Sequence, residues 1–273
     1  MLILTSQQVR EWDLFTIKNK PISSINLMET AATVCCEWLS ANRFDNLPIH
    51  IFCGKGNNGG DGLAIARIMA GHGLTPLLSI LETGKPGTED FQTNLARLHE
   101  TSIQPHYIHS EENFPVVASG TVIIDAIYGT GLNRPAEGSA AKLIKHINAQ
   151  KCAVIAIDLP SGLNPDHSSK NNTVVTATHT LSFQCFKPAF LFPENEDAIG
   201  QLHILDIGLE PAFAETLTDT DLFIVKDIAS QLLRKRKSFS HKGDYGHAAI
   251  IAGSKGMMGA AVLSAKACLR SGA

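Results

Sequence analysis

The chain has 273 residues, of which 44% are hydrophobic and 18% are charged, and its formal net charge is −3. This length allows one large domain or two, and the composition is that of a globular protein with a substantial core rather than a disordered chain. The lack of a basic surplus argues against a nucleic-acid-binding protein. An anionic nucleotide stays a candidate ligand, because a few backbone N–H groups can bind phosphate locally.

Two helices are expected before the first strand. Thr5 precedes Ser6-Gln7-Gln8, and a threonine followed three residues later by a glutamine is typical of a helix start. A second helix is expected over residues 24–41, and it ends in the polar stretch before Pro48. The same N-terminal segment is too short in apolar residues for a signal peptide, and no apolar run is long enough to span a membrane.

From Ile49 onward, short apolar runs alternate with helical segments. Strands are expected over residues 49–53, 74–81, 105–108, 121–127, 153–159, 180–185 and 201–206, and helices over 63–70, 88–100 and 139–149. Strands that are apolar on both faces and alternate with helices predict a Rossmann-like, three-layer, doubly wound and mostly parallel sheet. The last two strands have no good helix between them, so they are expected to form an edge.

A domain boundary is predicted within residues 210–221, which gives a first domain over 1–220 and a second segment over 221–273. The second segment contains a basic run at 234–237, an expected strand at 248–253 and an expected helix at 259–269. A lone strand and helix cannot bury a core of their own. We therefore expect the beginning of a truncated second α/β domain rather than a piece that packs on the first.

The six cysteines contain no CxxC pair, and three of them lie in apolar, strand-like runs: Cys53, Cys152 and Cys185. This pattern is typical of reduced, buried thiols in a reducing compartment. We therefore expect a cytoplasmic protein.

Residues 54–62, with the sequence GKGNNGGDG, connect an expected strand to an expected helix and contain five glycines. Glycine lets the backbone turn tightly and approach a ligand closely, and the N-terminus of the following helix favours an anion such as phosphate. The segment is not a Walker loop, because no Lys-Ser/Thr closes it, and its Asn and Asp side chains depart from the dehydrogenase form of GxGxxG. The alternative is a glycine-rich turn without a ligand. We favour a binding loop, because such junctions usually face a site in this architecture.

Two further loops follow the ends of expected strands and contain glycine. Asp125 precedes the loop YGTG, and Asp158 precedes LPSG. A carboxylate in an apolar strand is costly unless it is paired, bound to a metal or exposed at the strand end. A helix or turn cap would explain either aspartate alone, but both together favour a site outside the strand ends. Asn58, Asp125, Asp158 and Ser161 are therefore expected to converge.

The segments GKGNNGGDG, DAIYGTGLNRP and AIDLPSGLNP, in this order, resemble the signature of the NAD(P)H-hydrate epimerase family. LMETAA at residues 27–32 resembles the Leu-Met-Glu segment of that family, and the resemblance covers about residues 5–210. The last 34 residues, from SHKGDYGH onward, resemble the opening of the ADP- or ATP-dependent NAD(P)H-hydrate dehydratase domain, which has a ribokinase-like fold. The chain is thus similar to bacterial bifunctional repair enzymes.

The resemblance implies that the chain interconverts the R and S forms of hydrated NADH or NADPH. Asp158 is implied to be catalytic, and the implied substrate contacts are Asn57, Asn58, Gly59, Gly60, Asp61, Gly129, Thr130, Gly131, Leu132, Asn133, Arg134, Pro135 and Asp158. It also implies a potassium ion on Asn58, Asp125 and Ser161, whose oxygen atoms suit a hard cation better than zinc. Dehydration with ADP or ATP is expected only from a complete second domain.

Three other functions stay open. A nicotinamide-dependent oxidoreductase would share the sheet and the glycine-rich loop, and Glu82 lies near the position of its ribose-binding acid. A non-catalytic scaffold is the second alternative, and a kinase, suggested only by the tail, is the third. The sequence leaves the choice between NADH and NADPH, the identity of the cation and a homo-oligomeric state undecided. No membrane or nucleic-acid partner is expected.

Overall fold

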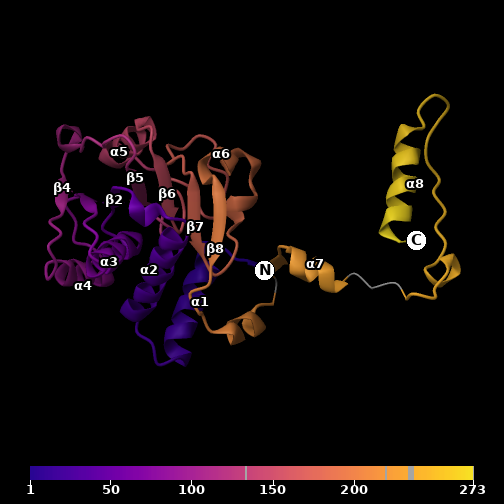
Figure 1. Cartoon of the computed structure of the whole chain (residues 1–273), viewed down its shortest axis with the longest axis horizontal. Helices are drawn as coiled ribbons and strands as arrows, with labels where there is room; N and C mark the ends of the chain where they lie inside the picture. The colour runs from indigo at the N-terminus through magenta and orange to yellow at the C-terminus, as the bar shows by residue number, and fades with distance from the viewer. Residues whose placement is uncertain (133, 219, 233–236, 273) are drawn as a thin grey trace. The chain divides into compact units, whose positions relative to one another are not determined.

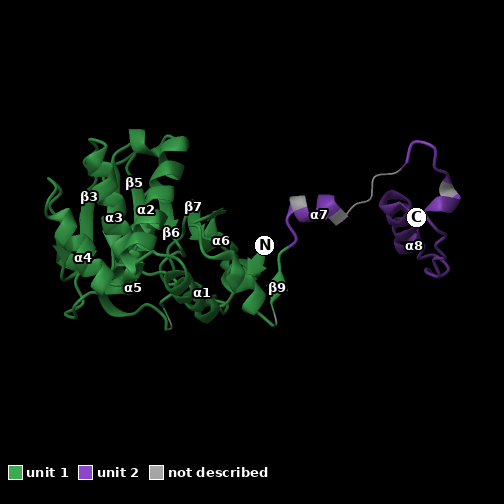
Figure 2. Cartoon of the chain, turned by 90° about the horizontal axis from the view of Figure 1, so that it is seen from below, with its two compact units in different colours: residues 1–223 green, residues 224–273 purple. Residues whose placement is uncertain are grey.

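The computed structural model of the chain describes residues 1–132, 134–218, 220–232 and 237–272 (Figure 1). They form two compact units, residues 1–223 and residues 224–273 (Figure 2). Arg234, Lys235 and Arg236 of the basic run lie outside the described residues. No helix among the described residues is both long and apolar enough to cross a membrane.

The first unit is built on a seven-stranded sheet in the order β4-β3-β2-β5-β6-β7-β8, and every neighbouring pair is parallel. The predicted parallel sheet is therefore confirmed, with β8 at one edge. A separate antiparallel pair joins β1 (Leu2–Ile3) to β9 (Asp221–Leu222). The strands of the large sheet are β2 (Ile49–Cys53), β3 (Leu77–Leu81), β4 (His106–Ile108), β5 (Val122–Ala126), β6 (Ala153–Ile157), β7 (His179–Phe183) and β8 (Gln201–Leu205).

Helices flank this sheet (Figure 1). The predicted capping box at Thr5 is confirmed, because its side chain accepts from the backbone of Gln8 while the Gln8 side chain accepts from the Thr5 N–H. The α-helices of the first unit are α1 (Ser6–Asn19), α2 (Ser24–Ala41), α3 (Asn57–Gly71), α4 (Glu89–Leu98), α5 (Gly138–Ala149) and α6 (Glu196–Ile199). Short 3-10 turns are η1 (Phe44–Asn46), η2 (Glu111–Asn113), η3 (Pro188–Leu191), η4 (Pro193–Asn195) and η5 (Pro211–Thr216).

The core lies on both faces of the sheet, because successive residues of a strand point to opposite sides. In β2, Ile51 packs with α2, α3 and α4, whereas its neighbour Phe52 packs with α5. In β5, Ile124 likewise packs on the side of α2, α3 and α4, and Ile123 packs on the side of α5. By this alternation Asp125 lies on the α5 side of the sheet. The helices on the two faces thus leave the strand ends as the place for polar chemistry.

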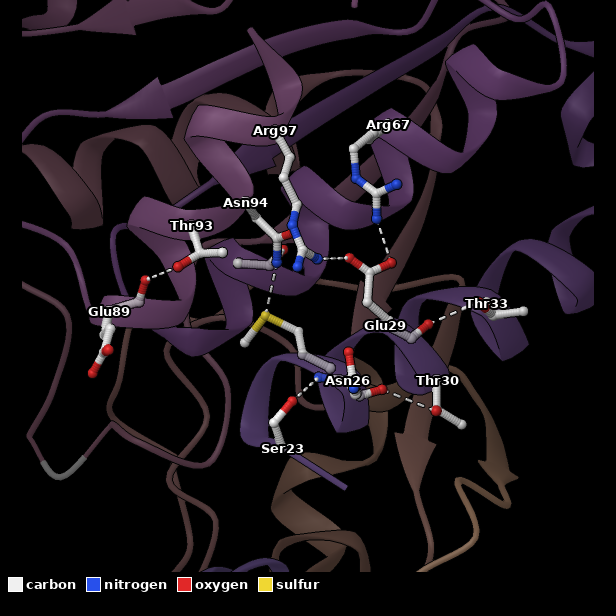
Figure 3. A network of polar contacts seen from close by, with 12 residues as sticks. Ser23, Asn26, Glu29, Thr30, Thr33, Arg67, Glu89, Thr93, Asn94 and Arg97 are labelled. Carbon is white, nitrogen blue, oxygen red and sulfur yellow. Dashed lines mark hydrogen bonds and ion pairs between the residues drawn. The ribbon is translucent and has the colours of Figure 1, made fainter. Parts of the chain in front are cut away.

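A polar network joins the three helices on the first face (Figure 3). Glu29 of α2 accepts from Arg67 of α3 and, at 2.8 Å, from Arg97 of α4. The Asn94 amide of α4 lies 3.1 Å from the sulfur of Met28. Glu29 of the LMETAA segment therefore ties α2 to α4 and to α3, which carries most of the glycine-rich segment, rather than facing a ligand.

The glycine-rich segment corrects one prediction. The helix expected to begin at Leu63 begins six residues earlier, at Asn57. The glycines permit this because they lie where the helix touches the strands. A Cβ at Gly59 would lie 1.9 Å from the carbonyl oxygen of Gly54, and one at Gly62 would lie 2.6 Å from the sulfur of Cys53. Their role in this part of the segment is close packing within a helix, not an extended loop.

The second unit contains α7 (Lys226–Leu232), the 3-10 turn η6 (Lys242–Asp244) and α8 (Gly259–Ser271). The helix expected over residues 259–269 is confirmed, but the strand expected at 248–253 is wrong. An extended segment becomes a strand only by pairing with another, and the described residues of this unit show only a bridge between Ser254 and Met257. Ile251 and Leu263 are largely exposed, as expected for a piece without a core.

Candidate active site

The strand order reverses direction between β2 and β5, because the chain adds β3 and β4 on one side of β2 and then returns to add β5 on the other. In doubly wound sheets a ligand binds outside the strand ends at such a switch point. A cavity of about 650 Å³ lies there. Its walls come from α1, α2, the N-terminus of α3 and the segments that follow β5, β6, β7 and β8.

The N-terminus of α3 opens into this cavity. Its first residues, Asn57 and Asn58, line the wall, and Gly56 makes no side-chain cap. The N–H groups of the first helical turn therefore keep hydrogen-bonding capacity and a positive dipole end. Asn58 is 8% exposed, and neither polar atom of its amide has a hydrogen-bond partner among the described residues. A buried amide without a partner indicates that a ligand or ion completes it.

The loop after β5 crosses this point at Gly129. A Cβ there would lie 2.7 Å from Oδ2 of Asp158 and 3.2 Å from Cγ of Asn58. Only glycine fits between the two side chains. Residues from three strand ends, 58, 129 and 158, thus meet at one place, as the sequence predicted for Asn58 and Asp158.

Asp158 follows β6 and is held on both carboxylate oxygens. Oδ1 lies 2.8 Å from Nζ of Lys187, and Oδ2 accepts from the N–H of Thr130 at 2.9 Å. Its backbone has φ +66°, a left-handed conformation that is unusual for a residue other than glycine. Such conformations cluster at functional sites, where the surrounding structure holds them in place. Asp158 is therefore fixed in position with its carboxylate at the cavity wall.

Lys187 completes this arrangement, and it was missed by the sequence analysis. Its side chain is fully buried, and besides Asp158 its ammonium donates to Oγ of Ser182 at 2.6 Å and to the carbonyl of Phe183. A buried charge is stable only when it is paired and hydrogen-bonded. The one available signal was a lysine inside the apolar run around Phe186 and Pro188, which does not identify its partner.

Asp125 and Ser161 form a second buried pair beside this wall. Ser161 donates from Oγ to Oδ1 of Asp125 at 2.6 Å and from its backbone to Oδ2 at 2.8 Å, and it accepts from the N–H of Tyr128. Burial raises the pKa of Asp125 to about 6, against the lowering effect of the hydrogen bonds from Ser161 and Ile127. Tyr128, which donates to Ser161, is followed in the chain by Gly129, and Gly129 lies between the side chains of Asn58 and Asp158. The Asp125–Ser161 pair is thus linked to that point through one peptide bond.

The predicted cation ligands can be tested against these contacts. Asn58 offers an amide oxygen that lacks a partner, Asp125 offers a fully buried carboxylate, and Ser161 offers a hydroxyl oxygen whose proton goes to Asp125. Among the described residues, no cationic side chain forms an ion pair with Asp125. These hard oxygen donors with uncompensated charge fit a hard monovalent cation.

Helix α1 supplies a wall of the cavity that the sequence did not indicate. Arg10, Trp12 and Asp13 line it, and the Arg10 guanidinium lies 3.4 Å from the carbonyl oxygen of Thr130. Burial raises the pKa of Asp13 to about 7; the charge of Asp158 raises it further, while Lys187 lowers it. No sequence pattern reveals this role, because Asp13 occupies an ordinary polar position of a helix.

Asp61 of α3 also lines the cavity and is half-buried. Burial raises its pKa well above the ordinary range, and the charges of Asp158, Asp13 and Asp90 add to this effect. The cavity therefore gathers more carboxyl groups than cations.

The predicted substrate contacts divide into three groups. Those that line the cavity are Asn57, Asn58, Asp61, Gly129, Thr130, Gly131, Leu132 and Asp158. Gly59 and Gly60 are buried inside α3, and Arg134 and Pro135 lie beyond the cavity wall. Asn133 lies outside the described residues.

The acid expected of an oxidoreductase is already engaged. Both oxygens of Glu82 bind Nζ of Lys55, at 2.8 and 3.0 Å, and one accepts from the N–H of Gly84. Glu82 is not part of the cavity wall. Its contacts disfavour a role in binding ribose.

Several known proteins are similar to this chain in sequence. A family model described as YjeF-related protein N-terminus matches residues 24–189. The bifunctional NAD(P)H-hydrate repair enzyme Nnr of Escherichia coli is 35% identical over 223 residues, which cover 82% of this chain and 42% of that protein. The NAD(P)H-hydrate epimerase of Limosilactobacillus reuteri is 34% identical over 210 residues, which cover 76% of this chain and 96% of that protein.

A solved structure shares the fold. The crystal structure of yeast ynu0 aligns with a TM-score of 0.63 at 18% identity, over 88% of this chain and 97% of that one. The chain spans about half the length of the first bifunctional relatives that it matches.

Proposed function

The chain belongs to the family of proteins related to the YjeF N-terminus, and on this premise we propose that it epimerises hydrated NADH or NADPH. The observation that carries the proposal is the meeting of Asn58, Gly129 and Asp158 at one wall of a 650 Å³ cavity. A relative named NAD(P)H-hydrate epimerase is matched over 96% of its length. The residues that meet at this wall, Asn58, Gly129 and Asp158, lie within residues 24–189, which the family model matches.

The dinucleotide would lie across the switch point. We expect its phosphates near the N-terminus of α3, where the N–H groups of residues 57–59 and the dipole favour an anion. Residues 129–132 would hold the other side, with the N–H of Thr130 already directed at Asp158. The hydrated ring would then lie against Asp158, next to the apolar part of the cavity.

Asp158 would transfer the proton in the reaction. The hydrated ring carries a hydroxyl at C6, and inversion requires this C–O bond to break and re-form from the opposite face. The ring nitrogen pushes the hydroxyl out as Asp158 donates a proton to it, which leaves water and an iminium ion. Proton transfer by a positioned carboxyl typically accelerates such a step by about 100- to 10,000-fold. Lys187 positions the carboxylate, because its ammonium lies 2.8 Å from Oδ1.

A potassium ion would be held by Asn58, Asp125 and Ser161. Such an ion would neutralise the charge of Asp125 and fix the loops after β5 and β6. The support is the unpartnered amide of Asn58 and the buried, unpaired carboxylate of Asp125.

The first test is the rate of epimer exchange in Asp158→Asn. We expect a fall of at least about 100-fold, the lower range for loss of a general acid. The matched control is Asp197→Asn, which changes an exposed carboxylate on α6 outside the cavity and is expected to keep the parent rate. An Asp158→Asn rate within about threefold of the parent would refute the role of Asp158.

Beyond the first unit, we propose that residues 221–273 correspond to the beginning of a dehydratase domain. Dehydration of the hydrate with ADP or ATP would then require the complete second domain. We also propose a cytoplasmic location, which the free cysteines support. An oxidoreductase is the weaker candidate, since Lys55 and Gly84 already bind Glu82.

A further inference from the structure

Of the aspartates that line the cavity, Asp158 and Asp13 differ in how their carboxylates are engaged. Asp158 is engaged on both oxygens, by Lys187 and by Thr130. Asp13 comes from α1, and its carboxylate has no hydrogen bond or ion pair among the described residues. The unpartnered amide of Asn58, which is more than nine-tenths buried, independently marks the same cavity as a ligand site.

Inversion at a ring carbon needs proton transfer on both faces of the ring. The hydroxyl leaves from one face, and water must add to the other. Proton transfer requires the acid or base to lie within hydrogen-bonding reach of the oxygen concerned, about 2.6–3.2 Å. A carboxylate fixed on one side of a bound planar ring does not reach an oxygen on the other side. A group that accelerates proton transfer on the other face must come from another part of the cavity wall, and α1 forms part of that wall.

We propose that Asp13 is a catalytic residue, the acid–base group that serves the ring face opposite Asp158. The inference rests on the proposed epimerase function. In one direction, Asp158 in its acid form gives its proton to the leaving hydroxyl, the C6–O bond breaks, and water and an iminium ion result. Water then attacks C6 from the other face, the new C–O bond forms, and the Asp13 carboxylate takes the released proton. In the reverse direction the two aspartates exchange these roles.

The environment of Asp13 suits a group that both gives and takes a proton. Burial and the charge of Asp158 raise its pKa to about 7, with Lys187 acting in the opposite sense. A catalytic pKa near the working pH gives the best balance between the two protonation states. Burial raises the pKa of Asp61, another carboxyl of the cavity wall, and the charges of Asp158 and Asp13 add to this effect. Arg10, on the same helix as Asp13, lines the cavity as well.

In the mechanism with one aspartate on each face, exchange of the C6 oxygen with water and inversion at C6 are separate events. Isotope exchange can measure each of them. In water labelled with ¹⁸O, the parent should incorporate label at C6 with inversion. In Asp13→Asn, Asp158 can still expel the hydroxyl from its own face and return water to that face. We therefore expect inversion to fall at least about 100-fold, while one epimer still gains label at a rate above the enzyme-free rate.

The matched control is Glu11→Gln, an exposed carboxylate two residues away on α1 that accepts a hydrogen bond from Gln7, and it should keep both rates. Thermal unfolding shows whether each variant is folded. If Asp13→Asn does not fold, Asp13→Ser is used for the same test. The inference is overturned if a folded Asp13 variant inverts C6 within threefold of the parent. It is also overturned if exchange and inversion are lost to the same extent.

Failure of the wider proposal would look different. A parent protein that inverts neither epimer faster than the enzyme-free solution overturns the epimerase function and this inference with it. A parent that inverts both epimers, with an Asp13 variant that does the same, overturns only the role of Asp13.

Discussion

Lys187 and Asp158 form an ion pair with the lysine side chain fully buried and the aspartate side chain 12% exposed. Such pairs owe little net stability to their attraction, because both ions lose hydration on burial. Removing one partner is costly, since the other charge stays buried and uncompensated. Loss of either partner should therefore lower the stability of the fold, apart from any effect on catalysis. Measuring stability separates this structural role from the proposed catalytic role.

We expect Lys187→Met to lower the free energy of unfolding by about 3–5 kcal/mol, because it leaves the Asp158 carboxylate buried without a cation. Adding Asp158→Asn should recover a large part of this loss, because the uncompensated charge is removed. Urea-induced unfolding measures both. The control, Lys142→Met, breaks an exposed pair with Glu111 and should cost about 1 kcal/mol or less. If the double variant is as unstable as Lys187→Met, packing rather than charge explains the loss.

The junction between β2 and α3 is the element on which the site depends. The helix begins at Asn57, four residues after β2 ends at Cys53, and this short turn brings Asn58 to the cavity. The turn is possible because Gly54 and Gly59 touch each other across it. Gly59 therefore has no room for a side chain, whereas Gly56 of the same segment has open space around it. Substituting each of them separates the two cases.

We predict that Gly59→Ala destabilises the protein by at least about 2 kcal/mol, because the new methyl would lie 1.9 Å from the Gly54 carbonyl and the backbone must shift. Gly56→Ala is the matched change, since a Cβ there has no neighbour within 4 Å, and it should cost about 1 kcal/mol or less. Thermal unfolding of the two variants compares them. Equal losses would contradict the close contact between Gly54 and Gly59.

At the scale of the whole molecule, the described cavity, sheet and core all belong to the first unit. That unit closes on itself at its two ends: β1 pairs with β9, the terminal amine donates to the carbonyl of Phe223 at 2.9 Å, and Phe223 stacks on Phe186. The residues of the cavity wall all lie between Val9 and Leu209 of the first unit. The first unit is therefore expected to fold and act by itself.

We expect a variant that ends at Val225 to unfold within about 2 °C of the full chain and to keep its epimerisation rate. A variant that ends at Thr220 is the comparison, because it loses β9 and the Phe223 stack and should be less stable by about 1–2 kcal/mol. Calorimetry and the epimer assay measure the two properties. Loss of activity in the longer variant would show that the second unit takes part in the site.

Much of the fold could be predicted from local sequence. All seven strands of the large sheet and the helices over 24–41 and 139–149 lie within a few residues of their predicted positions. The errors have local causes. The strand expected from Leu74 begins at Leu77, after Pro76, which has no N–H to give to a neighbouring strand. The strand expected to reach Leu159 ends at Ile157, because Asp158 turns into a left-handed conformation.

By itself, the sequence determined the α/β architecture and the three glycine-containing loops of the site, because periodicity, turn residues and strand-end position are local properties. Only the tertiary structure decided that α1 faces those loops, that Lys187 pairs with Asp158, and that Asp13 stands free in the same cavity. Lys187 lies 29 positions from Asp158 in the chain, and Arg10 of α1 lies 120 positions from Thr130, to which it donates. Burial and charge pairing act through space, so they appear only once the chain has folded.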